Sequence, residues 1–250
     1  MNYIDLFSGI GGFALGAYWA GMKFDRHYFS EVDPYCVELY QKRFPDAIPL
    51  GDITKHEEWD IADGEYIITG GFPCQPFSEA GKRRQEADAR NLWPGMRGVI
   101  RSVRPVWVVA ENVQGAAEYI KRVVKPELEA ESFDVWPFSI SARALGAWQV
   151  RKRLFIMAHS TSNRRHRPAR SVQYRATHEK LQTAACRPSW GWSSKQRGSL
   201  SGRLRPFPDP GVFKVADGLS RKMELAGFGN AIVPQIAQLL FEQIRRCEEE

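Results

Sequence analysis

The chain has 250 residues and a formal net charge of +6, with 43% hydrophobic and 26% charged side chains, which indicates a soluble globular protein with one well-packed domain and a small second lobe. The four cysteines lie far apart without a C-x-x-C pair, which argues against a disulfide framework or a zinc site and suits a reducing cytoplasm. Glycines and Asp5 interrupt the apolar segment Tyr3–Ala20, so we expect neither a signal peptide nor a membrane span there.

Strands and helices are expected to alternate along the chain. In chain order the pattern predicts a strand at Tyr3–Phe7, a helix at Phe13–Ala20, a strand at His27–Ser30, a helix at Pro34–Arg43, a strand at Tyr66–Thr69, a helix at Leu92–Val103, a strand at Val106–Ala110, a helix at Ala116–Glu131, strands at Phe133–Ile140 and Leu154–Ala158, and a final helix at Ile232–Arg246. This order predicts an α/β fold with a mostly parallel sheet and helices on both faces. Ligands of such sheets bind beyond the carboxyl ends of the strands.

Glycines and carboxylates occupy the loops after the first strands. The loop Phe7–Gly12 has the spacing G-x-G-G, which lets the backbone turn tightly and lets a ligand approach closely. Glu31 ends the second strand, where an acid can accept hydrogen bonds from ribose hydroxyls, and Asp52 follows in a third loop, where it could accept from an adenine amine. Singly, each acid is more often a helix cap or a solvated surface charge, and the glycine loop by itself is a structural turn nearly as often as a ligand-binding loop. Their succession after neighbouring strands predicts an adenosine ligand. Phosphate transfer is disfavoured, because the sequence contains no Walker lysine loop.

Cys74 stands between two prolines in the segment Gly70–Ser78, directly after the strand at Tyr66–Thr69. A lone cysteine is usually a buried structural residue. A loop rich in proline and glycine, however, faces solvent to satisfy its backbone, and the prolines hold the thiol rigidly at the ligand edge of the sheet. We therefore predict that Cys74 is a nucleophile. Glu111, at the end of the next strand, could face this thiol; the alternative is a helix-capping Asn112 with an incidental acid beside it.

Positive charge is concentrated between Ser160 and Pro206. This stretch has eleven Lys and Arg side chains against one acid, Glu179, whereas the rest of the chain has 24 basic and 28 acidic side chains. It also carries a tyrosine and two tryptophans among small polar residues. Basic residues interleaved with aromatics suit a nucleic-acid backbone and base edges, although a solvated loop region has the same composition.

Five motifs resemble those of the cytosine-5 DNA methyltransferases, occur in the order of that family, and span nearly the whole chain outside the basic stretch: Asp5–Gly12, Phe72–Gln75, Glu111–Val113, Gln149–Arg153 and Gly229–Pro234. The resemblance implies a Rossmann-like fold that depends on S-adenosylmethionine, with a small target-recognition lobe. It also implies methylation of carbon-5 of cytosine in duplex DNA at a specific sequence, with the target base flipped out of the helix.

The resemblance assigns roles to individual residues. The Cys74 thiolate would add to carbon-6 of cytosine, Glu111 would bond ring nitrogen 3 and the exocyclic amine, and Arg151 and Arg153 would line the pocket. No metal is expected. The residues expected to surround the cofactor S-adenosylmethionine are Phe7, Gly9, Gly11, Glu31, Asp52, Pro73, Leu92 and Asn230.

The same resemblance predicts the domain organisation and the partners. Residues 1–159, completed by residues 218–250, are expected to form the catalytic domain, and residues 160–217 the basic target-recognition region, poorly ordered without DNA. We expect a cytoplasmic monomer that binds double-stranded DNA and no membrane. The sequence leaves open whether a cognate restriction endonuclease accompanies it; such an enzyme is not expected to be physically bound to it.

Two alternatives belong to other functional classes. One branch of this family methylates cytosine in tRNA with the same motifs, and the long basic stretch favours duplex DNA over that substrate. A non-catalytic DNA-binding homologue is expected to carry a damaged motif, whereas Cys74, Glu111 and both arginines are intact here. Methyltransferases that modify amino groups of bases are disfavoured, because no Asp/Asn-Pro-Pro-aromatic tetrad occurs in the sequence.

Overall fold

The computed structural model describes residues 1–73, 91–145, 151–162 and 232–249. Its strands are β1 (Asn2–Leu6), β2 (His27–Ser30), β3 (Ile48–Pro49), β4 (Tyr66–Gly70), β5 (Trp107–Val113), β6 (Phe133–Ser141) and β7 (Lys152–Ser160). Its α-helices are α1 (Gly12–Trp19), α2 (Pro34–Arg43), α3 (Trp93–Val103), α4 (Ala117–Tyr119), α5 (Lys125–Ala130) and α8 (Pro234–Glu249). Helical turns of other types are η1 (Ile53–Glu58), η3 (Gln114–Ala116), η4 (Ile120–Val124) and η5 (Ala142–Leu145).

The strands form one sheet in the order β3-β2-β1-β4-β5-β7-β6. Neighbouring strands from β3 to β5 are parallel, and β7 runs antiparallel to both β5 and β6. The predicted α/β fold with a mostly parallel sheet is therefore confirmed, with β7 as the reversed strand among the described residues. The predicted end of β5 at Ala110 is wrong: the strand continues to Val113, because its last three residues still pair with β7. The two-residue strand β3 and the turn η1 were not predicted.

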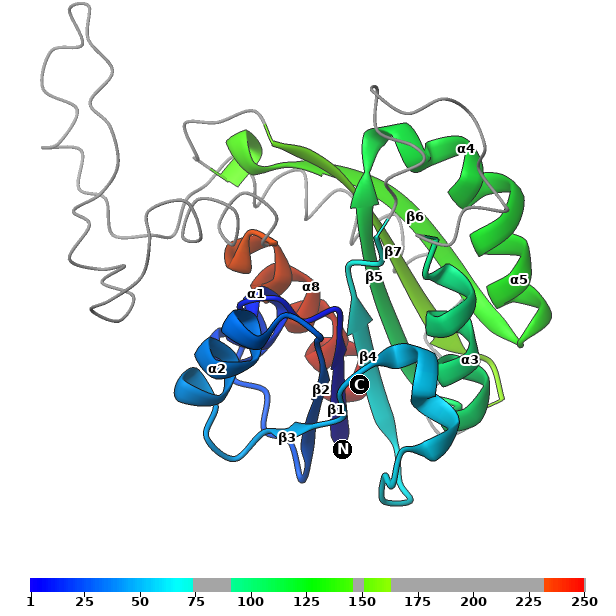
Figure 1. The fold of residues 1–250 in the computed structure, drawn as a ribbon. Helices are drawn as coiled ribbons and strands as arrows, with labels where there is room; N and C mark the ends of the chain where they lie inside the picture. Colours follow the sequence, from blue (N-terminus) through cyan, green and yellow to red (C-terminus); the bar gives the residue numbers. More distant parts are fainter. Residues whose placement is uncertain (74–90, 146–150, 163–231, 250) are drawn as a thin grey trace, which may run out of the picture.

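Helices cover both faces of this sheet, as Figure 1 shows: α1, α2 and α8 lie on one side and α3, α4 and α5 on the other. Side chains of a strand point alternately to the two faces. Tyr3 and Val109 accordingly pack with α1 and α8, whereas Ile4 and Val108 pack in the core beneath α3. The continuous apolar runs in the sequence thus supply two cores, one on each face.

The helix α2 has the predicted bounds, and local interactions explain both of its ends. The Asp33 carboxylate accepts hydrogen bonds from the backbone N–H groups of Tyr35 and Cys36 at 2.9 and 3.1 Å. Proline follows at the first helical position, where its missing N–H costs nothing. Lys42 and Arg43 occupy the last turn, where positive charge is favourable next to the helix dipole.

The helix predicted at Ala116–Glu131 is interrupted. After Tyr119 the chain makes the π-helical turn η4 and resumes as α5 at Lys125. The next residue is Pro126, which has no N–H for the carbonyl four residues earlier and whose ring crowds that carbonyl. The wider π turn accommodates the proline and lets the helix continue in nearly the same direction.

The last described helix packs against the first. Ile236, Leu240 and Phe241 of α8 are buried in the core that also contains Phe13 and Ala17 of α1, and the two helices lie side by side in Figure 1. Residues from both ends of the sequence therefore share one core. The boundaries 1–159, 160–217 and 218–250 stay a prediction, because residues 163–231 lie outside the described residues.

Candidate active site

Three adjacent strands reach the same level at one edge of the sheet. Leu6 of β1 pairs with Gly70 of β4, and Gly70 pairs with Ala110 of β5. The chain therefore leaves β1 and β4 at neighbouring positions, beside the point where Glu111 continues β5. This edge is the carboxyl end of the parallel strands, where α/β proteins bind their ligands.

The Glu31 carboxylate braces the glycine loop that follows β1. Its Oε2 accepts the Gly9 N–H at 2.8 Å, and its Oε1 accepts the N–H groups of Val32 and Asp33 at 2.8 and 3.0 Å. These bonds use three of the about four acceptor positions of a carboxylate. Glu31 thus joins the end of β2 to the loop after β1, a role that the sequence did not reveal, and it keeps acceptor capacity for a ligand hydroxyl.

The glycine loop is shaped for close approach of a ligand. Phe7 and Gly9 have φ values of +52° and +51°, and a non-glycine residue such as Phe7 rarely adopts this region. A Cβ atom built on Gly9 would have no atom within 4 Å. The neighbouring Ser8 hydroxyl is buried and has no hydrogen-bond partner among the described residues. An open backbone, an unpaired hydroxyl and the Glu31 carboxylate together fit the sugar of an adenosine group.

Two other predicted cofactor residues also have structural roles. A Cβ on Gly11 would meet the Phe44 ring at 2.7 Å, so the glycine is needed there for packing. Asp52 caps η1 by accepting the Thr54 N–H at 2.9 Å, and this hydrogen bond lowers the pKa of Asp52. The helix cap that the sequence left as an alternative is therefore present. Unused acceptor positions of the Asp52 carboxylate are still suited to a ligand amine.

Glu111 lies in a mostly buried ion pair. Its Oε1 is 3.1 Å from Arg153 Nε, and the two side chains are 14% and 23% exposed. Burial raises the pKa of Glu111, while Arg153 and Arg151 partly offset this by favouring the charged form. Burial and repulsion from Arg153 lower the pKa of Arg151. The acid and both arginines predicted from the sequence are thus close together, and the acid retains a proton more readily than an exposed glutamate.

Asn112 fixes the backbone that leads to Cys74. Its Nδ2 donates to the Phe72 carbonyl at 3.2 Å, and it lies buried within β5, so it is not the helix cap that the sequence left open. A Cβ on Gly71 would stand 3.4 Å from Glu111 Oε2. The backbone between β4 and Cys74 therefore runs directly past the Glu111 carboxyl and is tied to the strand that carries it. Sequence reasoning missed this role of Asn112, for which position next to the acid was the only signal.

The structure does not describe every predicted site residue. Cys74 and Asn230 lie outside the described residues, as does nearly all of the predicted target-recognition region. Pro73 is half-buried and is the last described residue before Cys74. Leu92 is partly buried and packs against the core directly before α3. Within the described ranges, no group of three or more side chains could hold a metal ion.

Comparisons with known proteins agree on one family. A model of the family described as C-5 cytosine-specific DNA methylase matches residues 1–189. The type II methyltransferase M1.ScrFI of Lactococcus lactis subsp. cremoris is 37% identical over 159 residues, which cover 62% of this chain and 40% of the relative. M.HhaI of Haemophilus parahaemolyticus is 33% identical over 162 residues, which cover 63% and 48%. The chain thus spans less than half the length of these relatives.

A solved structure gives the same result for the fold. A prophage-encoded E. coli protein described as a DNA modification methyltransferase superposes with a TM-score of 0.52 and 28% identity, covering 66% of this chain and 48% of that chain. Together with the family match, this likeness confirms the Rossmann-like methyltransferase fold predicted from the motifs.

Proposed function

Because this chain belongs to the family of C-5 cytosine-specific DNA methylases, we propose that it transfers a methyl group to carbon-5 of cytosine in duplex DNA, at a specific sequence. The cofactor of the family is S-adenosylmethionine, which when bound supplies a methyl group activated by an adjacent sulfonium. The chain itself must bind this donor, extrude the target base and activate its carbon-5.

The loops at the carboxyl edge of the sheet support the cofactor assignment. In this proposal Glu31 accepts hydrogen bonds from the ribose, and Asp52 accepts one from the adenine amine. The open backbone at Gly9, joined to Glu31 by a 2.8 Å hydrogen bond, lets the sugar approach without a Cβ in the way. The remaining residues proposed to complete the cofactor site are Phe7, Gly11, Pro73, Leu92 and Asn230.

Activation of cytosine falls to Cys74 and Glu111. Carbon-5 of cytosine is too weakly nucleophilic to attack a methyl group directly. The Cys74 thiolate forms a bond to carbon-6, and the displaced ring electrons make carbon-5 nucleophilic, while a proton from Glu111 stabilises the charge at ring nitrogen 3. After methyl transfer, water takes the carbon-5 proton, the electrons of that C–H bond expel the Cys74 sulfur as a thiolate, and the proton on ring nitrogen 3 returns to Glu111, which restores the aromatic ring. Arg151 and Arg153 bind the cytosine carbonyl oxygen, and positive charge near the thiol favours the thiolate.

The observation that carries this proposal is the position of the Glu111 carboxyl. It is mostly buried, its pKa is raised, and it lies against the Gly71 backbone three residues before Cys74. A carboxyl whose pKa is raised holds its proton more readily than an exposed one, and in its protonated form it can donate a hydrogen bond to a ring nitrogen. An incidental surface glutamate would have none of these properties.

Substitution of the nucleophile tests the proposal. We expect Cys74→Ser to abolish cytosine methylation, measured by bisulfite sequencing of DNA incubated with the purified protein and S-adenosylmethionine, while calorimetry shows that cofactor binding survives. Duplexes that contain 5-fluorocytosine should form a covalent adduct with the unmodified protein, because fluorine at carbon-5 is not eliminated as a proton is. Full activity of the Cys74→Ser protein would refute the mechanism.

Cys36→Ser is the matched control for this experiment. Cys36 is half-buried on α2, and burial, reinforced by the negative charge of Glu31 and Asp33, raises the pKa of its thiol to about 12. It is therefore a poor nucleophile at neutral pH. We expect Cys36→Ser to methylate DNA and to form the adduct as the unmodified protein does.

The nucleic acid is tested by parallel incubation with duplex DNA and tRNA. The proposal expects methyl incorporation into duplex DNA, and incorporation into tRNA alone would favour the RNA-modifying alternative. Residues 160–217 are proposed to read the target sequence. The bases on either side of each methylated cytosine in the bisulfite data will show which DNA sequence is recognised. We further propose that the protein acts as a monomer in the cytoplasm, where thiols stay reduced. None of the helices in the described ranges is long and apolar enough to cross a membrane.

A further inference from the structure

The residues described on either side of the Cys74 segment lie close together in the core. Phe72, two residues before Cys74, packs its ring against that of Trp93, with ring centroids 5.3 Å apart. Both rings are almost completely buried. The positions of residues 72 and 93 are therefore fixed relative to each other. Contacts that hold the chain at residues 91–93 thus also bear on the positions of Leu92 and of Phe72, two residues before Cys74.

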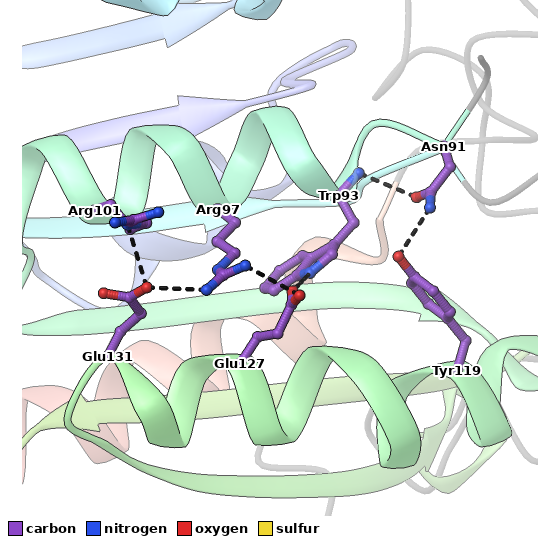
Figure 2. A network of polar contacts seen from close by, with 7 residues as sticks. All are labelled: Asn91, Trp93, Arg97, Arg101, Tyr119, Glu127 and Glu131. Atoms are coloured by element: carbon purple, nitrogen blue, oxygen red, sulfur yellow. Dashed lines mark hydrogen bonds and ion pairs between the residues drawn. The ribbon is translucent and has the colours of Figure 1, made fainter. Parts of the chain in front are cut away.

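On the side before Cys74, the backbone is held by the hydrogen bond from Asn112 to the Phe72 carbonyl. On the side that begins at Asn91, it is held by a row of polar contacts with the helix α4–η4–α5, which Figure 2 shows in side view. Asn91 stands at the end of the row next to the site: its Nδ2 donates to the Tyr119 hydroxyl at 2.8 Å, and its Oδ1 accepts the Trp93 N–H at 3.2 Å. Both Asn91 and Tyr119 are buried.

The rest of the row clamps the two helices further from the site. Glu127 accepts hydrogen bonds from the Trp93 indole at 2.6 Å and from Arg97 at 3.0 Å. Glu131 pairs with Arg97 and Arg101 at 3.1 and 3.2 Å. These contacts hold α3 against α5 without any help from Asn91, so the Asn91–Tyr119 bond is not required for the two helices to pack.

The π turn brings Tyr119 into this row. In a regular α-helix, residues eight apart such as Tyr119 and Glu127 differ by about 80° around the axis. A π turn absorbs about one extra residue, and this reduces the difference to about 20°. Tyr119 therefore faces α3 in line with Glu127, where a regular helix would have turned its hydroxyl aside.

We propose that Asn91 and Tyr119 are positioning residues for the methyl-transfer reaction: their buried hydrogen bond fixes residue 91, where the described chain resumes after Cys74, beside Phe72, and with it the placement of Leu92. This inference rests on the proposed function. Loss of the Tyr119 hydroxyl would leave the Asn91 amide buried without its acceptor, which favours a shifted chain at residue 91. A shift of about 1 Å in a reacting group is enough to slow an enzymatic step strongly.

Tyr119→Phe and Asn91→Ala test the inference, because each breaks this bond without a change in charge. Tyr119→Phe removes the hydroxyl alone, whereas Asn91→Ala also removes the acceptor of the Trp93 N–H. We expect each to lower the single-turnover rate of methylation and the rate of adduct formation with 5-fluorocytosine DNA by about tenfold, with the KM for DNA unchanged. If the two side chains act as a unit, the double variant Asn91→Ala/Tyr119→Phe should be no slower than Asn91→Ala alone.

Arg97→Gln is the matched control. It removes two ion pairs from the same row of contacts but leaves Asn91 and Tyr119 in place. We expect it to lower the midpoint of urea unfolding while both rates stay within about twofold of the unmodified protein. The inference is overturned if Tyr119→Phe reacts as fast as the unmodified protein, or if Arg97→Gln slows adduct formation as much as Tyr119→Phe does. If the unmodified protein methylates no DNA, it is the proposed function that fails.

Discussion

A buried chain of hydrogen bonds around Asp5 leads to a prediction about how the free energy of unfolding depends on pH. The Asp5 carboxyl accepts hydrogen bonds from the hydroxyls of Thr69 at 2.8 Å and Tyr40 at 3.0 Å. The Tyr40 hydroxyl also lies 2.8 Å from His27 Nε2. We predict that Asp5→Asn and His27→Gln change the pH dependence of the free energy of unfolding with opposite signs, although a single hydroxyl links the two groups.

The Asp5 contribution falls as the pH rises. Complete burial, ahead of the opposing hydrogen bonds, raises the pKa of Asp5 from its ordinary 3.8 to about 7. Between these pH values the folded protein holds a proton that the unfolded chain has lost. The resulting stabilisation is complete below the unfolded pKa and is lost as the pH rises through about 7. A pKa shift from 3.8 to about 7 corresponds to about 4 kcal/mol in the free energy of unfolding.

The His27 contribution has the opposite sign. Burial lowers the pKa of His27 from 6.5 to about 4, so between these values the unfolded chain holds a proton that the folded protein lacks. This contribution is present above pH 6.5 and is lost as the pH falls through about 4. It corresponds to about 3 kcal/mol. In the unmodified protein the two contributions largely cancel over their common range.

Urea unfolding of the three proteins at steps between pH 4 and pH 7.5 measures these contributions. Relative to the unmodified protein, Asp5→Asn should gain about 3 kcal/mol as the pH rises from 4 to 7, and His27→Gln should lose about 3 kcal/mol from pH 4 to 6.5. Comparison with the unmodified protein removes the titration of all other groups. If either difference stays constant with pH within about 1 kcal/mol, the assigned titration of that residue is wrong.

Three further predictions concern the fold and the site. Gly16→Ala should destabilise the protein by about 2 kcal/mol in urea unfolding, because its Cβ would lie 2.4 Å from Ala237 Cβ on α8, and this overpacking outweighs the about 1 kcal/mol gained in helix propensity; an unchanged midpoint would contradict the α1–α8 packing. Glu111→Gln should slow methylation about 100-fold or more in a single-turnover assay while leaving cofactor affinity unchanged, and near-normal turnover would show that no proton is needed from this side chain. Glu31→Gln should weaken S-adenosylmethionine binding about tenfold in calorimetry, because the charged acceptor that braces Gly9 is lost, and an unaltered Kd would remove Glu31 from the site.

The sequence predicted the elements of this fold well where local chemistry decides them. The helix α2 has the predicted bounds, because proline at its first position and Asp33 before it specify where a helix begins. The strand β2 also matches, because a short apolar run between turns leaves few alternatives. The motif series identified the family, and the family match confirms it. These signals all lie between residues that are close in the chain.

Other features depend on contacts between distant residues, and the sequence did not reveal them. The longer β5 depends on pairing with β7, whose partner residues lie forty or more positions later in the chain. The hydrogen bond from Asn112 to the Phe72 carbonyl depends on strand order. The alignment of Tyr119 with α3 depends on one π turn. In the sequence, Asp5 stood out as a charge in an apolar segment and as the first residue of a motif, and neither signal revealed its complete burial.

The sequence by itself therefore determined the alternation of strands and helices, the helix caps and the residue types available for methyl transfer. The tertiary structure alone decided which of these residues meet, how deeply Glu111 and Asp5 are buried, and hence the direction in which the pKa of each carboxyl moves. The physical reason is that turn, cap and helix preferences arise from neighbours in the chain, whereas register, burial and desolvation arise only when segments far apart in the sequence pack together.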